Sequence, residues 1–473
     1  MGSWYGLIEN MNNYEEDTIV AVSSPYGRGA IGVVRLSGQR AFEIAGNLFT
    51  GLGGRRMSSF AGRTVYHGRL MDEEKCIDEV LMFVMKKPQS YTGEDLVEIS
   101  CHGNPIILDN VIDACVKWGA RIAHSGEFTK RAFLNGKMDL TQAEAVAELI
   151  GARSEKAVSL AMANLSGKLK SQVVRTREGL LEILAGIEAR LDFPEDDIKS
   201  ETINNIIISI NKYIFDCDRM VKSFKAGKMI RDGLKVVIVG KANAGKSSLF
   251  NRLLDIDRSI VTSHRGTTRD LIEESMSIDG IPIVLVDTAG ISIECENEIE
   301  HESVRRSKEA LINANILLFV IDRSCEWSSQ DKEIAKISAG KPGIAVLNKA
   351  DLAVGLNRDA VHEAISSWPF VEVSSLYGDG IDKLKLAIYN MYAENFSCED
   401  LDNGLLCNIR HKNSIKECLN SLQRAINAGS NGYHEEVIAM EMRRAIDILG
   451  EIIGEETNDE LLDKIFSSFC IGK

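Results

Sequence analysis

The feature that most constrains the fold of this 473-residue chain is a glycine-rich loop at 240–247, Gly-Lys-Ala-Asn-Ala-Gly-Lys-Ser. It follows the apolar run Val236-Val-Ile-Val and precedes a helical pattern that starts at Ser248. Such a loop wraps a polyphosphate, because its backbone N–H groups and the start of the helix point at the phosphate oxygens. We therefore expect Lys246 at the β- and γ-phosphates and Ser247 as a ligand of Mg²⁺.

Three further motifs follow in the order typical of a GTPase. Residues 266–270 (GTTRD) supply Thr268 as a second Mg²⁺ ligand, while 287–290 (DTAG) and 348–351 (NKAD) each follow a predicted strand. Guanine offers a carboxylate two hydrogen-bond donors that adenine lacks, so the last motif selects GTP. Residues 374–376 (SSL) form a weaker fifth element. The predicted nucleotide site comprises Asn243, Ala244, Gly245, Lys246, Ser247, Ser248, Gly266, Thr267, Thr268, Asp287, Thr288, Ala289, Gly290, Asn348, Lys349, Asp351, Ser374, Ser375 and Leu376.

The residue that directs the hydrolytic water is not at its usual position. Ras-type enzymes place a glutamine directly after the D-x-x-G glycine, whereas this chain has Ile291 there. The substitute is expected to be a carboxylate within 294–302, a second cation near the phosphates, or a group from a partner. Asn243, inside the phosphate loop, is a candidate ligand for such a cation, and a role as a turn former is the alternative.

Three patterns divide the chain. Residues 17–137 alternate strand-like runs with turns and one helix at 105–116, which indicates an α+β domain. Apolar residues then recur every three or four positions from 140 to 191 and again from about 405 to 466, the period of long amphipathic helices. Glycines are expected to break or loosen these helices at Gly151, Gly167, Gly179 and Gly186.

Between the helical stretches, short apolar strands alternate with helical segments, which predicts a parallel doubly wound sheet. The economical interpretation is a helical domain interrupted by an inserted α/β domain. The expected divisions are 1–137, 138–232 for the first helical part, 233–394 for the GTPase domain, and 395–473 for the second helical part.

Composition restricts the partners. The chain carries 55 basic and 69 acidic residues, a net charge of −14. Proteins that bind the phosphate backbone of nucleic acids non-specifically are usually basic. A nucleic-acid contact in this acidic chain must therefore be made by a local basic patch or be shared with a partner. Apolar stretches such as Ile316–Ile321 fall far short of the ~20 residues of a membrane helix. Ten cysteines without a C-x-x-C pair indicate reduced thiols, and we expect a cytoplasmic protein without a membrane partner.

Several blocks outside the nucleotide motifs occur in a fixed order. They are Asp17-Thr-Ile-Val-Ala, Gly27-Arg-Gly, Val34-Arg-Leu-Ser-Gly, Ser90-Tyr-Thr-Gly-Glu-Asp, residues 126–137, Asp139-Leu-Thr-Gln-Ala-Glu, Asp192-Phe-Pro-Glu and the terminal Cys470-Ile-Gly-Lys. Together they resemble the MnmE (TrmE) family of tRNA-modifying GTPases over essentially the whole chain after residue 16. The resemblance implies an N-terminal folate-binding and dimerisation domain, and a helical domain that is interrupted by a Ras-like P-loop GTPase domain and ends in a C-x-G-K tail.

The resemblance also implies partners and chemistry. A homodimer would join the flavoprotein MnmG (GidA) in a heterotetramer and add an aminomethyl or carboxymethylaminomethyl group to C5 of the wobble uridine of certain tRNAs. The one-carbon unit would come from a tetrahydrofolate, 5-formyl or methylene, with FAD and NADH on the partner and glycine or ammonium as the nitrogen donor. By position, the folate site would comprise Arg35, Glu98, Lys137 and Lys473, and Cys470 would be a functional thiol.

For hydrolysis, the resemblance implies K⁺ at Asn243, Thr262, His264 and Thr267, supplying the positive charge that an arginine finger supplies elsewhere. Glu300 would position the water molecule that attacks the γ-phosphate. Because the stretch 291–300 is one residue longer than is typical of the family, Glu298 and Glu302 are the alternatives. Two other functions stay open: a ribosome-assembly or translation-checkpoint GTPase with RNA-binding flanking domains, and a folate-sensing scaffold with vestigial GTPase activity.

Overall fold

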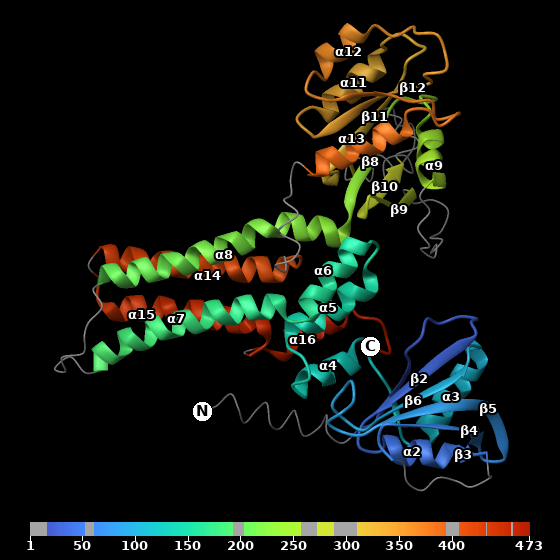
Figure 1. The fold of residues 1–473 in the computed structure, drawn as a ribbon, viewed down its shortest axis with the longest axis vertical. Helices are drawn as coiled ribbons and strands as arrows, with labels where there is room; N and C mark the ends of the chain where they lie inside the picture. Colours follow the sequence, from blue (N-terminus) through green and yellow to red (C-terminus); the bar gives the residue numbers. More distant parts are fainter. Residues whose placement is uncertain are drawn as a thin grey trace, which may run out of the picture. The chain divides into compact units, whose positions relative to one another are not determined.

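The computed structural model describes residues 17–52, 61–192, 203–256, 272–287, 310–393, 406–431, 433–455 and 457–473. The chain forms two compact units (Figure 1). The first unit combines Met1–Ala147 with Gly450–Lys473, and the second is Glu148–Leu449. The first unit is therefore built from both ends of the chain.

The first unit contains a seven-stranded sheet with the order β3-β4-β5-β6-β2-β1-β7, antiparallel except for the pair β1–β7. Helices α2 (Ala41–Leu48) and α3 (Pro105–Lys117) pack against it and bury the core. Asn104 caps α3 by accepting a hydrogen bond from the Ile106 N–H, and proline suits the first helical position. The strands are β1 (Ile19–Val22), β2 (Ile31–Ser37), β3 (Phe49–Gly51), β4 (Thr64–Asp72), β5 (Lys75–Met85), β6 (Leu96–His102) and β7 (Arg121–Ile122). The predicted α+β class is confirmed.

Helices from opposite ends of the chain complete this unit. α4 (Glu127–Leu134) and the start of α5 (Leu140–Gly151) pack with α16 (Asp459–Phe466). Their shared apolar cluster contains Leu140, Ala143, Leu462, Phe466 and Phe469. Lys130 on α4 also donates to the Asp463 carboxylate on α16 at 2.7 Å. These contacts bring the end of the chain back to the N-terminal sheet.

Long helices run side by side in the second unit (Figure 1). They are α7 (Lys168–Asp192), α8 (Ile203–Asp232), α14 (Ile409–Ser430) and α15 (Glu435–Ile453), with the shorter α6 (Glu155–Leu165) beside them. α5 ends at Gly151 and Gly167 lies between α6 and α7, which confirms the predicted breaks at these two glycines. α7 continues through Gly179 and Gly186, so a break at either of them was a wrong prediction. A Cβ on Gly179 would collide with Tyr213 Oη of α8, so glycine there allows two helices to approach closely.

The inserted domain has a six-stranded sheet with the order β13-β12-β11-β8-β10-β9. Neighbouring strands from β13 to β10 are parallel, which confirms the predicted parallel sheet. β9, a strand that the sequence analysis did not predict, pairs antiparallel with β10 at one edge. Asp279 and Gly280 both have positive φ and close a two-residue β9–β10 hairpin, as Asp-Gly pairs commonly do. The strands are β8 (Leu234–Val239), β9 (Ile272–Ile278), β10 (Ile281–Asp287), β11 (Ile316–Asp322), β12 (Gly343–Asn348) and β13 (Phe370–Glu372).

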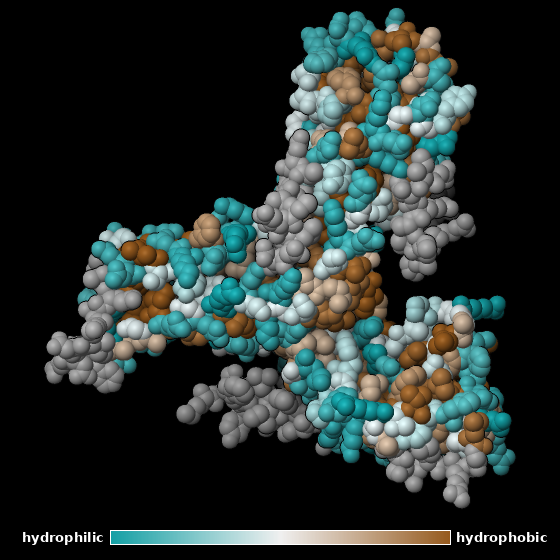
Figure 2. All heavy atoms as spheres, in the orientation of Figure 1, coloured by the Kyte–Doolittle hydropathy of each residue, from teal (hydrophilic) through white to brown (hydrophobic). Residues whose placement is uncertain are grey.

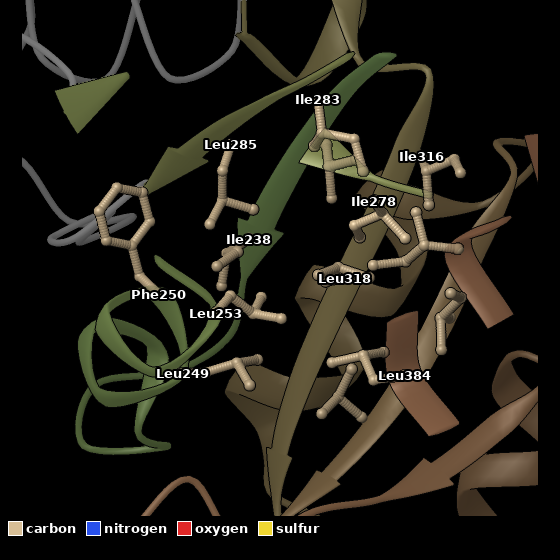
Figure 3. Close-up of a cluster of buried hydrophobic side chains, with 14 of the residues drawn as sticks. Ile238, Leu249, Phe250, Leu253, Ile278, Ile283, Leu285, Ile316, Leu318 and Leu384 are labelled. Atoms are coloured by element: carbon tan, nitrogen blue, oxygen red, sulfur yellow. The ribbon is translucent and has the colours of Figure 1, made fainter. Parts of the chain in front are cut away.

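Helices cover both faces of this sheet, which confirms the doubly wound α/β class of the inserted domain. α9 (Lys246–Ile256) and α13 (Ile381–Ala393) pack on one face, where Leu253, Leu318 and Leu384 are fully buried (Figure 3). α11 (Ser329–Ser338) and α12 (Arg358–Ala364) cover the other face over Phe319 and Leu347. The sheet is thus a rigid base for the loops at its carboxyl edge.

Within the described residues, no helix combines the length and apolar character needed to cross a bilayer. Eight cysteines lie in the same residues, and all are free thiols.

Candidate functional site

The phosphate loop connects β8 to α9 at the carboxyl edge of the inserted sheet. Its backbone turns through positive φ at Gly240 (155°), Asn243 (61°) and Gly245 (95°). A Cβ on Gly245 would collide with the side-chain amide of Asn348, so only glycine fits there. Asn243 is the non-glycine residue among the three, and asparagine is one of the few L-residues that adopts this conformation readily. The loop therefore has the shape that wraps a phosphate chain.

Lys246, Ser247 and Asp287 lie together beneath this loop. The Lys246 ammonium is buried and donates to the Lys241 carbonyl at 3.0 Å. Burial lowers the pKa of Lys246, and the negative charge of Asp287 opposes that change. Ser247 Oγ donates to Asp287 Oδ2 at 3.1 Å. A hydroxyl beside a carboxylate suits Mg²⁺, which takes few protein oxygens and completes its shell with water and phosphate oxygens.

Asn348, at the end of β12, links the phosphate loop to the segment 374–376. Its side chain is buried; Nδ2 donates to the Ala244 carbonyl at 2.9 Å, and Oδ1 accepts from Ser375 N at 3.1 Å and Ser375 Oγ at 2.8 Å. Ser374 Oγ donates to Asp351 Oδ1 at 2.5 Å, while the Asp351 side chain stays exposed. Three of the motifs predicted from the sequence therefore converge on one edge of the sheet.

Two supporting residues were missed by the sequence analysis. Asp322, at the end of β11, accepts from Lys349 Nζ at 2.6 Å and from Ser324. Burial opposes its ionisation, but these hydrogen bonds outweigh burial and lower the pKa of Asp322 to about 2. Arg252 of α9 donates to the carbonyls of Ser375 and Leu376. The position of Asp322 at the carboxyl end of a parallel strand was a usable signal, whereas nothing local marked Arg252.

Some predicted residues lie outside the described part of the chain. They are Thr262, His264, Gly266, Thr267, Thr268, Thr288, Ala289, Gly290 and Glu300, together with the alternatives Glu298 and Glu302. Their predicted roles at Mg²⁺, K⁺ and the hydrolytic water stay predictions.

A second group of predicted residues meets in the first unit, where the C-terminal tail lies against the sheet. The Gly472 carbonyl accepts from Ser23 Oγ at 3.0 Å and from the Arg35 guanidinium at 3.2 Å, and Ile471 forms a β-bridge with Ser125. Gly472 has φ of 91°, and a Cβ there would collide with the carbonyl of Val22. The tail therefore fits only with glycine at this position.

Arg35 and Glu98 face each other across β2 and β6, and Arg35 Nε and Nη2 both donate to Glu98 Oε1 at 2.9 and 2.7 Å. The Arg35 guanidinium lies over the rings of Tyr91 and Phe128, at 5.2 and 5.5 Å from their centroids. Burial and the positive charge of Arg35 lower the pKa of Lys473. The structure thus gathers three of the four residues predicted to bind folate.

Two further predicted residues lie at the margins of this group. Cys470 is exposed, and its carbonyl accepts from Gly126 N at 3.4 Å. Lys137 is also exposed and donates to the Pro88 carbonyl at 3.0 Å. Pro88 belongs to the loop that carries Tyr91, whose ring lies beneath the Arg35 guanidinium, so Lys137 and Arg35 contact the same loop.

The fold and the phosphate loop define a P-loop GTPase with large flanking domains. The family model "MnmE helical domain" matches residues 140–470, and the model "GTP-binding protein TrmE N-terminus" matches residues 18–137. The tRNA modification GTPase MnmE of Staphylococcus haemolyticus is 38% identical over 460 residues, 97% of this chain and 99% of that protein, and the protein of Staphylococcus aureus strain Newman matches equally well. This chain belongs to the MnmE family and is a GTP hydrolase.

Solved structures of GTPases also match. Era from Aquifex aeolicus, bound to GDP and AlF4−, is 29% identical, with 40% of this chain and 66% of that chain covered and a TM-score of 0.29. The G domain of the T. maritima FeoB transporter is 25% identical, with 34% of this chain and 98% of that chain covered and a TM-score of 0.27.

Proposed function

We propose that this protein is a K⁺-stimulated GTPase that acts with the flavoprotein MnmG to modify the wobble uridine of certain tRNAs. Membership of a family whose relatives are named tRNA modification GTPases, over 97% of the chain, supports the tRNA part. Because the match includes both flanking domains, it disfavours a ribosome-assembly GTPase with unrelated RNA-binding domains. The hydrogen bonds of Lys246 to the Lys241 carbonyl and of Ser247 to Asp287 disfavour a scaffold with vestigial hydrolysis.

We propose a role in GTP binding or hydrolysis for each motif of the nucleotide site. Lys246 neutralises the phosphates, and Ser247 with Thr268 would hold Mg²⁺, which supplies positive charge to the phosphate oxygens. Asp351 would accept the two guanine donors, and Asn348 links the phosphate loop to the segment 374–376. The catalytic carboxylate is proposed to be Glu300, with Glu298 and Glu302 as alternatives.

The single observation that carries the K⁺ proposal is the conformation of Asn243. Asn243 has a φ of 61°, a backbone conformation that glycine would adopt at a lower free-energy cost than any residue with a side chain. Retaining a side chain there is explained if its amide oxygen binds a cation. Oxygen ligands suit hard cations such as K⁺. Thr262, His264 and Thr267 are proposed to complete the set, His264 through its backbone carbonyl oxygen.

The folate proposal is supported by the tail of the first unit. Residues as far apart as Arg35 and Lys473 meet there with Glu98 and two aromatic rings. Guanidinium and ammonium groups suit the carboxylates of a folate, and a carboxylate suits its amino-pyrimidine donors. Lys137 is proposed to contribute from the neighbouring loop, and Cys470 is proposed as a functional thiol. A tetrahydrofolate bound there would supply the one-carbon unit.

The wider assembly completes the proposal. The protein would form a homodimer through its N-terminal domain and a heterotetramer with MnmG, which carries FAD and uses NADH, in the cytoplasm. The proposed domains are residues 1–137 for folate and dimerisation, 138–232 and 395–473 for the helical domain, and 233–394 for the GTPase domain. Because the GTPase domain is inserted into the helical domain, two chain segments connect the two domains. A GTP-dependent motion of the GTPase domain would reach the helical domain through both segments.

The proposal is tested by steady-state GTP hydrolysis in matched KCl and NaCl, for the wild type, Asn243→Ala and the control Asn357→Ala. Asn357 is an exposed residue of the same domain and caps α12, which packs on the opposite face of the sheet from α9. Stimulation by K⁺ that is lost only in Asn243→Ala supports the cation site. Equal rates in both salts would remove the K⁺ and Glu300 assignments and leave the GTP site unaffected.

A further inference from the structure

α8 and α14 form a basic region in an acidic protein. α8 carries six basic and three acidic residues, α14 carries four basic and one acidic, and so the pair has a net charge of +6 while the whole chain has −14. The two helices pack against each other (Figure 1). α15, in the same bundle, carries five acidic and two basic residues. The charge of the bundle is therefore segregated between its helices.

The exposed face of α8 has a regular pattern. Ile208, Lys212, Phe215, Arg219 and Lys222 follow one another at spacings of four, three, four and three residues, so they form one stripe along the helix. All five are exposed, and Ile208 and Phe215 are 68% and 67% exposed. The stripe spans about 21 Å at 1.5 Å per residue. We call these five residues the α8 stripe.

The surroundings of the α8 stripe cancel its positive charge only in part. Asp218 pairs with Lys222 at 2.6 Å, but both side chains are exposed, and a surface ion pair of this kind is weak. The other carboxylates of the two packed helices are Asp216 and Asp232 on α8 and Glu417 on α14, and Glu182 on α7 lines the same pocket as Lys212. Figure 2 shows hydrophilic residues with isolated hydrophobic ones over this part of the bundle. Exposed cations thus alternate with exposed apolar side chains.

This alternation fits RNA. Lysine and arginine side chains bind phosphates and release counterions, and an exposed phenylalanine gives an unpaired base a surface to stack on. We propose that the α8 stripe binds the phosphodiester backbone of the tRNA substrate, with Phe215 stacked on an unpaired base. The inference rests on the proposed function for the identity of the RNA. An acidic helix of a protein partner is the competing occupant, and the charge segregation of two whole helices favours the polyanion.

The test measures binding of a tRNA transcript by fluorescence anisotropy over a series of KCl concentrations, without nucleotide. The charge-reversal variant is Lys212→Glu, Arg219→Glu, Lys222→Glu. The matched control is Lys332→Glu, Lys336→Glu, Lys383→Glu, which changes the net charge equally at exposed positions of the inserted domain. The stripe variant is expected to bind at least about tenfold more weakly, with a salt slope smaller by about 2–3, and the control is expected to match the wild type.

Phe215→Ala separates stacking from charge. Loss of one stacked base should weaken binding by about 5- to 100-fold and leave the salt slope unchanged, because no counterion is involved. GTP hydrolysis should be unchanged in all variants, since none of these residues lies in the nucleotide site. This measurement also shows that the variants are folded.

Several outcomes would overturn the inference. Equal losses in the stripe and control variants would mean that only the total charge matters. Wild-type RNA binding in the stripe variant, together with loss of MnmG binding, would assign the stripe to a protein partner. A wild-type protein that binds no tRNA even at low salt would instead remove the tRNA part of the proposed function, and the stripe inference with it.

Discussion

The side chain of Asn348 is expected to determine nucleotide affinity through the two loops that it links, the phosphate loop and the segment 374–376. Asn348→Ala removes three hydrogen bonds, one to the Ala244 carbonyl and two from Ser375, all in a buried position. At about 1 kcal/mol net for each bond, the loss is about 3 kcal/mol. Because these bonds hold both loops in the binding conformation, most of the loss should appear as a cost of ordering them when the nucleotide binds. A loss of 3 kcal/mol corresponds to a dissociation constant about a hundredfold higher.

The assay is titration of a fluorescent GDP analogue against the wild type, Asn348→Ala and Asn357→Ala. Asn357 also caps a helix: its side chain accepts a hydrogen bond from the Asp359 N–H at 3.0 Å, at the start of α12 on the opposite face of the sheet from α9. Its loss should cost about 1 kcal/mol of stability and leave the dissociation constant unchanged. An Asn348→Ala affinity within threefold of the control would show that the loops keep their positions without this side chain and would refute the reasoning.

Three other substitutions probe the supports of the two sites. The pKa of Asp322 is about 2 in the folded protein and 3.8 for an ordinary aspartate. Its ionised form therefore stabilises the protein above pH 4, and this contribution fades as the pH falls towards 2. Asp322→Asn should cost about 2 kcal/mol at pH 7, with urea unfolding curves that converge near pH 2; parallel curves would contradict this. Gly472→Ala should displace the tail because its Cβ collides with the Val22 carbonyl, and folate binding measured by calorimetry should weaken at least tenfold, while GTP hydrolysis stays normal. Arg252→Ala should raise the dissociation constant for GTP about tenfold by releasing the carbonyls of 375–376, and an unchanged value would show that these carbonyls need no donor.

The sequence predicted the fold best where a motif with a known chemical role lies beside a regular pattern of apolar residues. The phosphate loop needs glycine at fixed positions, and the strands beside it are buried on both faces, so residues 240–248 and the buried strands could be located directly. The same reasoning failed at β9, whose partly polar sequence, Ile-Glu-Glu-Ser-Met-Ser-Ile, does not have the continuous apolar pattern of a central strand. The Asp279-Gly280 turn was the signal that could have identified the hairpin.

Other features depend on contacts between segments far apart in the chain. Gly179 looked like a helix breaker, but its role is set by Tyr213 on another helix. Arg252 is an ordinary helix-surface arginine until the fold brings 375–376 to it. Likewise, Arg35 and Glu98 were expected at a folate site only through the family resemblance. Nothing in the local sequence indicates that the last residues of the chain meet them.

The return of the chain to its first unit has a consequence for biosynthesis. The sheet of that unit is complete once residue 122 has been made, but α16 and the tail that pack with α4 belong to the last 24 residues. At 5–20 residues per second, the ribosome needs roughly 15–60 s to proceed from residue 147 to residue 450. During that interval Phe133 and Leu140 lack their partners Leu462 and Phe466. A chain released early therefore exposes an apolar surface that the finished protein buries, and quality-control proteases can distinguish truncated from complete molecules by that surface.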